Sequence, residues 1–222
     1  MTAASPTASA VGGTVNYVTR MPEAEFGGML QPSLGEHNFR RILGVIDSGA
    51  LGPWDTRSFW AGSYTNYDKW KGPGEIEKQQ YNARLYQDLG GDGDFMALAV
   101  HYNENRNNFY RNLRLTDYLA TPGLENDISC TRPTGVNGTA QNESTQSTIV
   151  NYLGVTSTGS CTNYHGLRIN PSNTGNIRGQ LSYGLTDNLR LTVDPSFQYV
   201  LANGGGFTAI SESDDRLDLS TV

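Results

Sequence analysis

The chain has 222 residues, with 26 Gly, 12 Tyr, only 17% charged residues and a formal net charge of −6. The length allows one large or two small domains, and the composition favours strands and turns over helices. An acidic chain in which no basic patch interleaves with aromatic residues argues against nucleic acid as a partner. No run of about 18 apolar residues occurs, which excludes a membrane helix but leaves open a membrane barrel built of short alternating strands.

The N-terminal segment contains one predicted strand. Residues 1–6 have neither a basic start nor an apolar core, so they do not read as a secretory signal. Residues 1–11 are small and polar and are expected to be loose. In residues 12–22, two glycines precede a β-branched alternation that ends at a proline. This pattern predicts a short strand entered through a close backbone turn.

Three further strands are predicted before the middle of the chain, over residues 26–34, 38–51 and 57–67. Turns rich in Gly, Pro and polar residues separate them, and a medium loop follows at residues 68–75. The face assignment of the second strand stays open, because both sets of alternating positions carry apolar residues. These sets are Ile42, Gly44 and Ile46 on one side and Leu43, Val45 and Asp47 on the other.

The clearest element is a hairpin over residues 79–103, whose two arms alternate apolar and polar residues with a period of two. Residues 90–93, Gly-Gly-Asp-Gly, supply the positive φ angles of a tight reversal. If Leu89 pairs with Asp94, the apolar residues of both arms gather on one face. The expected pairs are Leu85 with Leu98, Ala83 with Val100, and Tyr81 with Tyr102. A slip of one residue would destroy this match, so the register is strongly specified.

A long insertion follows, about residues 106–175, and it shows no sustained period. Loops of this length are uncommon in compact soluble domains, whereas outer-membrane barrels carry them on the extracellular side. The insertion holds both cysteines, Cys130 and Cys161. A disulfide between them is the favoured interpretation and implies an oxidising compartment, with two free thiols as the alternative. Because such a compartment requires export, the missing secretion signal predicts that the chain lacks its true beginning.

Residues 177–199 form a second alternating hairpin that reverses at residues 186–188. Its expected pairs are Leu185 with Leu189 and Leu181 with Val193, which again gather apolar residues on one face. After residue 203 the chain is Gly-rich and acidic and ends without a predicted closing strand.

The connections between the seven strands of residues 26–199 sort by side. Those after the second, fourth and sixth are short and those after the third, fifth and seventh are longer, while the one after the first is brief. Such alternation is typical of an up-and-down barrel that has short turns at one edge and long loops at the other. Four aromatic residues near the strand ends far from the short turns are expected to form an interfacial girdle: Tyr81, Tyr102, Phe197 and Tyr199.

Residues 12–22 resemble the closing strand of the plug domain in TonB-dependent outer-membrane receptors. In that family a Gly-Gly pair, a β-branched alternation with Asn, Val-Thr, a basic residue and a proline precede the barrel. The resemblance covers about eleven residues and implies an all-β fold, an antiparallel up-and-down transmembrane β-barrel. Residues 1–22 would be the C-terminal end of the plug and residues 23–222 the N-terminal part of the barrel. The seven strands would be about a third of a 22-stranded wall.

The resemblance also implies a function. Receptors of this type carry out energised uptake of a scarce ligand, such as an iron-siderophore, cobalamin or an oligosaccharide, across the outer membrane of a Gram-negative bacterium. The implied partners are that ligand, outer-membrane lipid and an inner-membrane TonB-type energy-coupling complex, which docks on a region preceding the plug. No enzymatic chemistry and no cofactor are expected. Two alternatives stay open: a passive porin-type channel and a soluble β-sandwich that binds glycans.

Several short motifs have a plainer interpretation than a site. Residues 91–94, Gly-Asp-Gly-Asp, lack the further carboxylates of a calcium loop and are expected to be a turn. The three histidines, His37, His101 and His165, are scattered and do not have metal-ligand spacing. Aromatic and basic residues of the insertion are candidates for ligand contacts, although an ordinary solvated loop is favoured for each. These candidates are Tyr110, Tyr118, Tyr152, Tyr164, Arg106, Arg111, Arg114 and Arg132.

Overall fold

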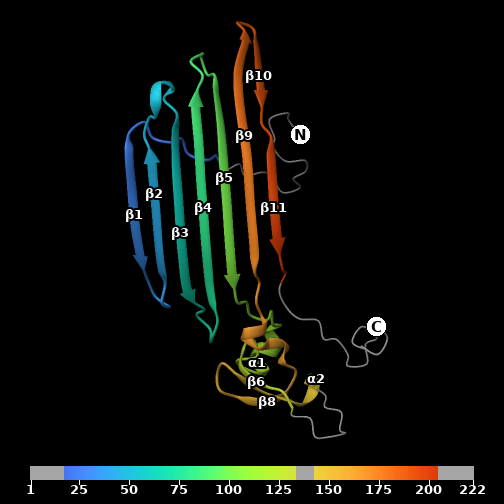
Figure 1. Ribbon diagram of the computed structural model, residues 1–222. Helices are drawn as coiled ribbons and strands as arrows, with labels where there is room; N and C mark the ends of the chain where they lie inside the picture. Colours follow the sequence, from blue (N-terminus) through green and yellow to red (C-terminus); the bar gives the residue numbers. More distant parts are fainter. Residues whose placement is uncertain (1–17, 134–142, 205–222) are drawn as a thin grey trace, which may run out of the picture.

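The computed structural model describes residues 18–133 and 143–204, and one large antiparallel sheet dominates it (Figure 1). The strands lie in the order β1-β2-β3-β4-β5-β9-β10, and β11 pairs with β9 beyond the end of β10. Their bounds are β1 Phe26–Leu34, β2 Arg40–Ser48, β3 Arg57–Asp68, β4 Glu75–Asp88, β5 Phe95–Asn107, β9 Ser172–Thr186, β10 Leu189–Val193 and β11 Ser196–Ala202. The sheet is open: within the described ranges no strand pairs with the outer side of β1 or of β10 and β11.

The first predicted hairpin is confirmed in register. Tyr81 lies opposite Tyr102, and Leu85 lies opposite Leu98. The Leu89 amide donates to the Asp94 carbonyl at 3.0 Å, which closes the turn as expected. Both strands continue further than predicted, because polar residues at their far ends still alternate between the two faces.

The second hairpin is confirmed in part. Leu181 lies opposite Val193, but the expected pair of Leu185 with Leu189 is wrong. Leu189 lies opposite Thr186 instead, and a bulge separates it from the rest of the ladder. A bulge adds one residue to a strand, so it shifts the pairing beyond it by one position. The returning strand is also split at Pro195, whose ring nitrogen has no hydrogen to donate to a ladder.

The two ends of the sheet differ strongly (Figure 1). The turn edge carries the β2–β3, β4–β5 and β9–β10 connections, including the short 3-10 helix η1 (Gly52–Trp54). The cap edge carries the β1–β2 and β3–β4 connections and the long segment 108–171 between β5 and β9, which we call the cap. The predicted sorting by length is confirmed only for the cap and is wrong for the other connections: the β2–β3 connection at the turn edge spans residues 49–56, whereas the β3–β4 connection at the cap edge spans only residues 69–74.

The cap is folded, contrary to the expectation of a segment without regular structure. It contains a separate three-stranded antiparallel sheet in the order β6-β7-β8 and several single turns of helix. Their bounds are α1 Leu115–Ala120, β6 Asp127–Thr131, α2 Glu143–Gln146, β7 Ser147–Asn151, β8 Thr156–Gly159, η2 Cys161–Asn163 and η3 His165–Leu167. Elements of three to six residues are too short to show a period, which explains why the sequence pattern did not reveal them. No helix in the described ranges is long and apolar enough to cross a bilayer.

The large sheet has one apolar and one polar face, and the apolar face is exposed. Trp60 is 62% exposed, Leu98 44% and Phe197 65%. The open question about β2 is resolved, because Ile42 and Ile46 lie on this apolar face opposite Tyr64 and Trp60. On the polar face, Phe59 is the one buried apolar side chain that the described strands contribute. The sheet therefore has no apolar core of its own.

Candidate functional site

An irregular segment, residues 18–25, crosses the polar face of the sheet near the turn edge before it enters β1 (Figure 1). The Arg20 guanidinium donates to the Asp47 carboxylate at 2.6 Å, and the Glu23 amide donates to the same group at 3.0 Å. Arg20 also lies over the Phe59 ring, with its guanidinium carbon 4.2 Å from the ring centroid. A charge-assisted bond and a cation–π contact thus hold Arg20 on β2 and β3. The strand expected at residues 12–22 is absent over residues 18–22, and its earlier part lies outside the described residues.

Arg84 of β4 provides a second attachment for this segment. Its guanidinium donates to the Thr19 carbonyl at 2.5 Å and to the Gln180 side chain of β9 at 3.2 Å. Arg84 is only 6% exposed. One side chain therefore joins the crossing segment to two strands that are far apart in the sequence.

Towards the cap edge the polar face is lined by amides and hydroxyls. The Asn105 amide donates to the Ser172 hydroxyl at 3.1 Å, and the Asn103 amide donates to the Thr174 hydroxyl at 3.4 Å. Asn103 is buried, and its side-chain oxygen has no hydrogen-bond partner. A surface of this kind can exchange hydrogen bonds with water or with a polar ligand.

The cap is fastened to the β3–β4 loop through Lys71. Its ammonium group donates to the Glu125 carboxylate at 3.1 Å, and the Tyr152 hydroxyl donates to the same oxygen at 3.1 Å. The Lys71 amide donates to the Tyr110 hydroxyl at 3.0 Å, and the ammonium lies 5.0 Å from the Tyr118 ring centroid. Three of the predicted ligand contacts, Tyr110, Tyr118 and Tyr152, therefore converge on one lysine, where they hold the cap in place.

The pKa values of two buried carboxyl groups in the cap are shifted in opposite directions. Burial opposes ionisation of Glu125, but its own backbone amide, Lys71 and Tyr152 outweigh this effect and hold its pKa below the usual value. For Asp127 burial dominates and raises the pKa, although Arg111 opposes the change. Asp127 is 2% exposed, and one of its carboxylate oxygens has no hydrogen-bond partner. The bond with Glu125 raises the pKa of Lys71, which keeps this ion pair charged at neutral pH.

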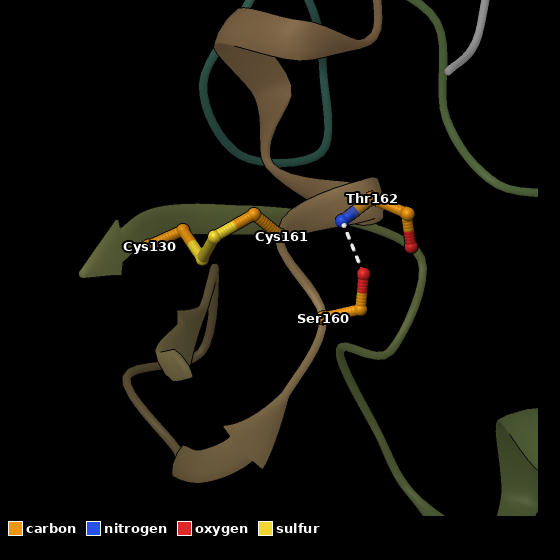
Figure 2. Close-up of a disulfide and its surroundings, with 4 residues drawn as sticks. All are labelled: Cys130, Ser160, Cys161 and Thr162. Carbon is orange, nitrogen blue, oxygen red and sulfur yellow. Dashed lines mark hydrogen bonds between the residues drawn. A yellow bond between two sulfur atoms is a disulfide. The ribbon is translucent and has the colours of Figure 1, made fainter. Parts of the chain in front are cut away.

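Cys130 and Cys161 form a disulfide inside the cap (Figure 2). Their Cα atoms are 5.6 Å apart, and the bridge joins β6 to the start of η2. The Ser160 hydroxyl accepts a bond from the Thr162 amide at 3.3 Å and caps this 3-10 turn, as Figure 2 shows. The bridge closes the segment that contains α2, β7 and β8.

The aromatic residues expected to form a girdle lie together on the apolar face. Tyr81 and Tyr102 are paired, and Tyr199 lies beyond them across Gly175 of β9. Phe197 lies one step nearer the turn edge, opposite Ile177. On the cap-edge side of this row the next residues of the same face on β4, β5 and β9 are polar, namely Gln79, Glu104 and Asn173, whereas the next one on β11, Leu201, is apolar.

The other predicted candidates lie apart from one another. His101 bonds with Asn82 on the polar face at 2.8 Å, and His165 packs against Tyr164 in the cap with ring centroids 4.8 Å apart. Arg106 lies at the strand end, where it pairs with Glu104 at 3.0 Å. Residues 91–94 form the turn between β4 and β5. In the described ranges no group of three His, Cys, Asp or Glu residues could hold a metal ion.

Several residues of the site were not identified from the sequence. Lys71, Glu125 and Asp127 read as ordinary loop charges, and their partners are distant along the chain. Asp47 carried a usable signal, because it is a carboxylate that directly follows the apolar or glycine positions 42–46 of β2. Searches against protein-family models, curated proteins and solved structures find no match to this chain.

Proposed function

We propose that the chain is the end of a plug and the first part of the barrel wall of a TonB-dependent outer-membrane receptor. Its role would be energised uptake of a scarce ligand, such as an iron-siderophore. The observation that carries the proposal is the distribution of side chains on the large sheet. The apolar face is exposed, while Asp47 and Arg84 are buried on the polar face. A water-soluble protein rarely exposes an apolar surface of this extent.

The height of the apolar band supports a membrane environment. On β9 the residues of this face from Gly175 to Leu185 are apolar or glycine. Ten residue steps span about 33 Å along a strand. With the usual barrel tilt this corresponds to about 25 Å across the membrane, the height of the apolar band of outer-membrane barrels. The row of Tyr81, Tyr102 and Tyr199 would then lie at the interface on the cap side.

The crossing segment supports a plug. Residues 18–25 lie against the polar face, which would be the lumen side of a barrel, and Arg20 and Arg84 attach them there. A passive porin-type channel would share the same wall, but it needs no segment fastened across its lumen. The turn edge, where the chain enters β1, would face the periplasm, and the cap would lie outside the cell.

The ligand, the TonB-type energy-coupling complex and outer-membrane lipid are the proposed partners, and no chemistry on the ligand is part of the proposal. Within the described residues the outer sides of β1 and β11 have no partner strand, and each unpaired backbone group costs several kcal/mol in lipid. We therefore expect the 222-residue chain to need detergent, or a partner that covers both sides.

The three tryptophans offer a direct test, because they lie at different heights. Trp60 lies on the apolar face, Trp54 at the turn edge and Trp70 at the cap edge. The Trp54→Phe/Trp70→Phe variant keeps only Trp60 and is placed in micelles of a brominated detergent. We expect the bromine atoms to quench the fluorescence of Trp60, and acrylamide in the water to leave this fluorescence nearly unaffected.

The matched control is Trp54→Phe/Trp60→Phe, which leaves Trp70. In this control, acrylamide should quench the fluorescence of Trp70 strongly, and the brominated detergent should quench it weakly. A soluble β-sandwich would give a different result: the chain would stay in solution without detergent, and Trp60 would be shielded from both quenchers. That outcome would overturn the membrane proposal, transport included.

A further inference from the structure

A small polar cavity of about 120 Å³ lies between the crossing segment and the polar face. Thr19 forms one side, and side chains of β4, β5 and β9 form the other, among them Asn82, His101 and Asn176. Two arginines, Arg84 and Arg178, also line it. The cavity is several times larger than the space that one water needs, so it has room for a small four-oxygen anion.

Among the described residues, no carboxylate balances the charge of Arg84. Its bonds go to neutral acceptors, the Thr19 carbonyl and the Gln180 amide. Its Nε–H is buried and has no acceptor. Arg178 carries a charge of the same sign, but it is paired with Asp194. Among the described residues no carboxylate forms an ion pair with Arg84, and a buried cation without a counter-charge is costly.

The composition of the chain outside the described residues narrows the possible sources of a counter-charge. Residues 1–17 and 134–142 contain neither Asp nor Glu. The remaining acids are in residues 205–222: Glu212, Asp214, Asp215 and Asp218. The planar guanidinium group binds two oxygens of a carboxylate or phosphate at once. A small oxyanion from solution would therefore neutralise the charge of Arg84 and match the geometry of its donors.

We propose that this cavity binds a small oxyanion, a phosphate or carboxylate group, against Arg84. The anion joins residues 18–19 to β4 and β9, so its binding fastens the crossing segment and its release loosens it. The inference does not depend on a membrane or on transport, and its failure would leave the proposed function unchanged.

The test is the thermal unfolding midpoint of the full 222-residue chain in detergent, with phosphate, acetate or chloride at matched ionic strength. A ligand that binds only the folded state raises the midpoint in a saturable way. We expect such a rise with phosphate or acetate and none with chloride. Arg84→Gln should weaken the apparent affinity about 10- to 100-fold, the range expected for loss of a charge-assisted bond. Arg190→Gln, on the same face but at the turn edge, should keep the response.

A second variant tests the cavity without removing Arg84. Asn82→Asp keeps the acceptor for His101 and places a carboxylate beside Arg84. It should raise the midpoint in chloride and abolish the response to added oxyanions. The proposal fails if neither phosphate nor acetate shifts the wild-type midpoint, or if Arg84→Gln responds like the wild type. It also fails if neutralising the four acids of residues 205–222 is needed before phosphate has an effect, because the chain itself would then fill the cavity.

Discussion

The cap offers the sharpest test of what stabilises this protein, because it has almost no apolar core. Cys161 is the one buried hydrophobic side chain of its described residues, whereas Glu125, Asn126 and Asp127 are all buried. Hydrogen bonds and the disulfide must therefore supply most of its stability. We predict that a Cys130→Ser/Cys161→Ser variant loosens the cap and leaves the large sheet intact.

The size of the effect follows from the loop that the bridge closes. Cys130 and Cys161 are separated by 31 positions. The chain-entropy relation gives about 3.7 kcal/mol for a loop of this length at 25 °C. This is an upper value, because β5 and β9 already hold the two ends of the cap together. It corresponds to at most about a 400-fold increase in the population of the opened cap.

Hydrogen exchange followed by mass spectrometry measures this opening for each element separately. In the variant, amides of β6, β7 and β8 should exchange faster by up to about 400-fold, while those of β4 and β5 keep their wild-type rates. Mild reduction of the wild-type chain should reproduce the result. The reasoning is refuted if the cap amides exchange at wild-type rates, or if β4 and β5 accelerate as much as the cap.

Three further predictions concern contacts of the cap. Asp127→Asn should stabilise it at neutral pH by about 1–3 kcal/mol, measured by hydrogen exchange. Because burial raises the pKa of Asp127, the wild type loses stability as pH rises from the unfolded-state pKa through the folded-state pKa, and the variant should lack this loss. Glu125→Gln should act in the opposite direction: its lowered pKa contributes stability that is present above the usual Glu pKa and disappears as pH falls through the folded-state value. Equal effects of the two substitutions would contradict both assignments. Gly72→Ala should detach the cap from the β3–β4 loop, because φ is +68° and an added Cβ would lie 2.5 Å from the Tyr152 Cβ. Gly90→Ala is the control, since it has φ of +82° but open space, and it should cost only the backbone strain of about 1–2 kcal/mol. If Gly72→Ala costs no more than the control, the contact with Tyr152 does not hold the cap.

The sequence alone determined most strands of the large sheet and the apolar face of its two hairpins. The pairing of Leu85 with Leu98 could be predicted because a slip of one residue would put the apolar side chains on the polar face. The exposure of these residues is also consistent with the predicted apolar outer surface. Period-two alternation is a local property of the chain, so it can be read without knowing what the strand contacts.

Only the tertiary structure decided which distant groups meet. Lys71 and Glu125 are 54 positions apart, and Arg20 and Asp47 are 27 apart. The face of β2 was equally undecided, because both of its sides are apolar and only the contacts with β3 distinguish them. The bulge at Leu189 and the folding of the cap were missed for the same reason. Each is decided by which residues meet in the folded chain, whether they are close in the sequence or distant, and no local alternation of residue types records such contacts.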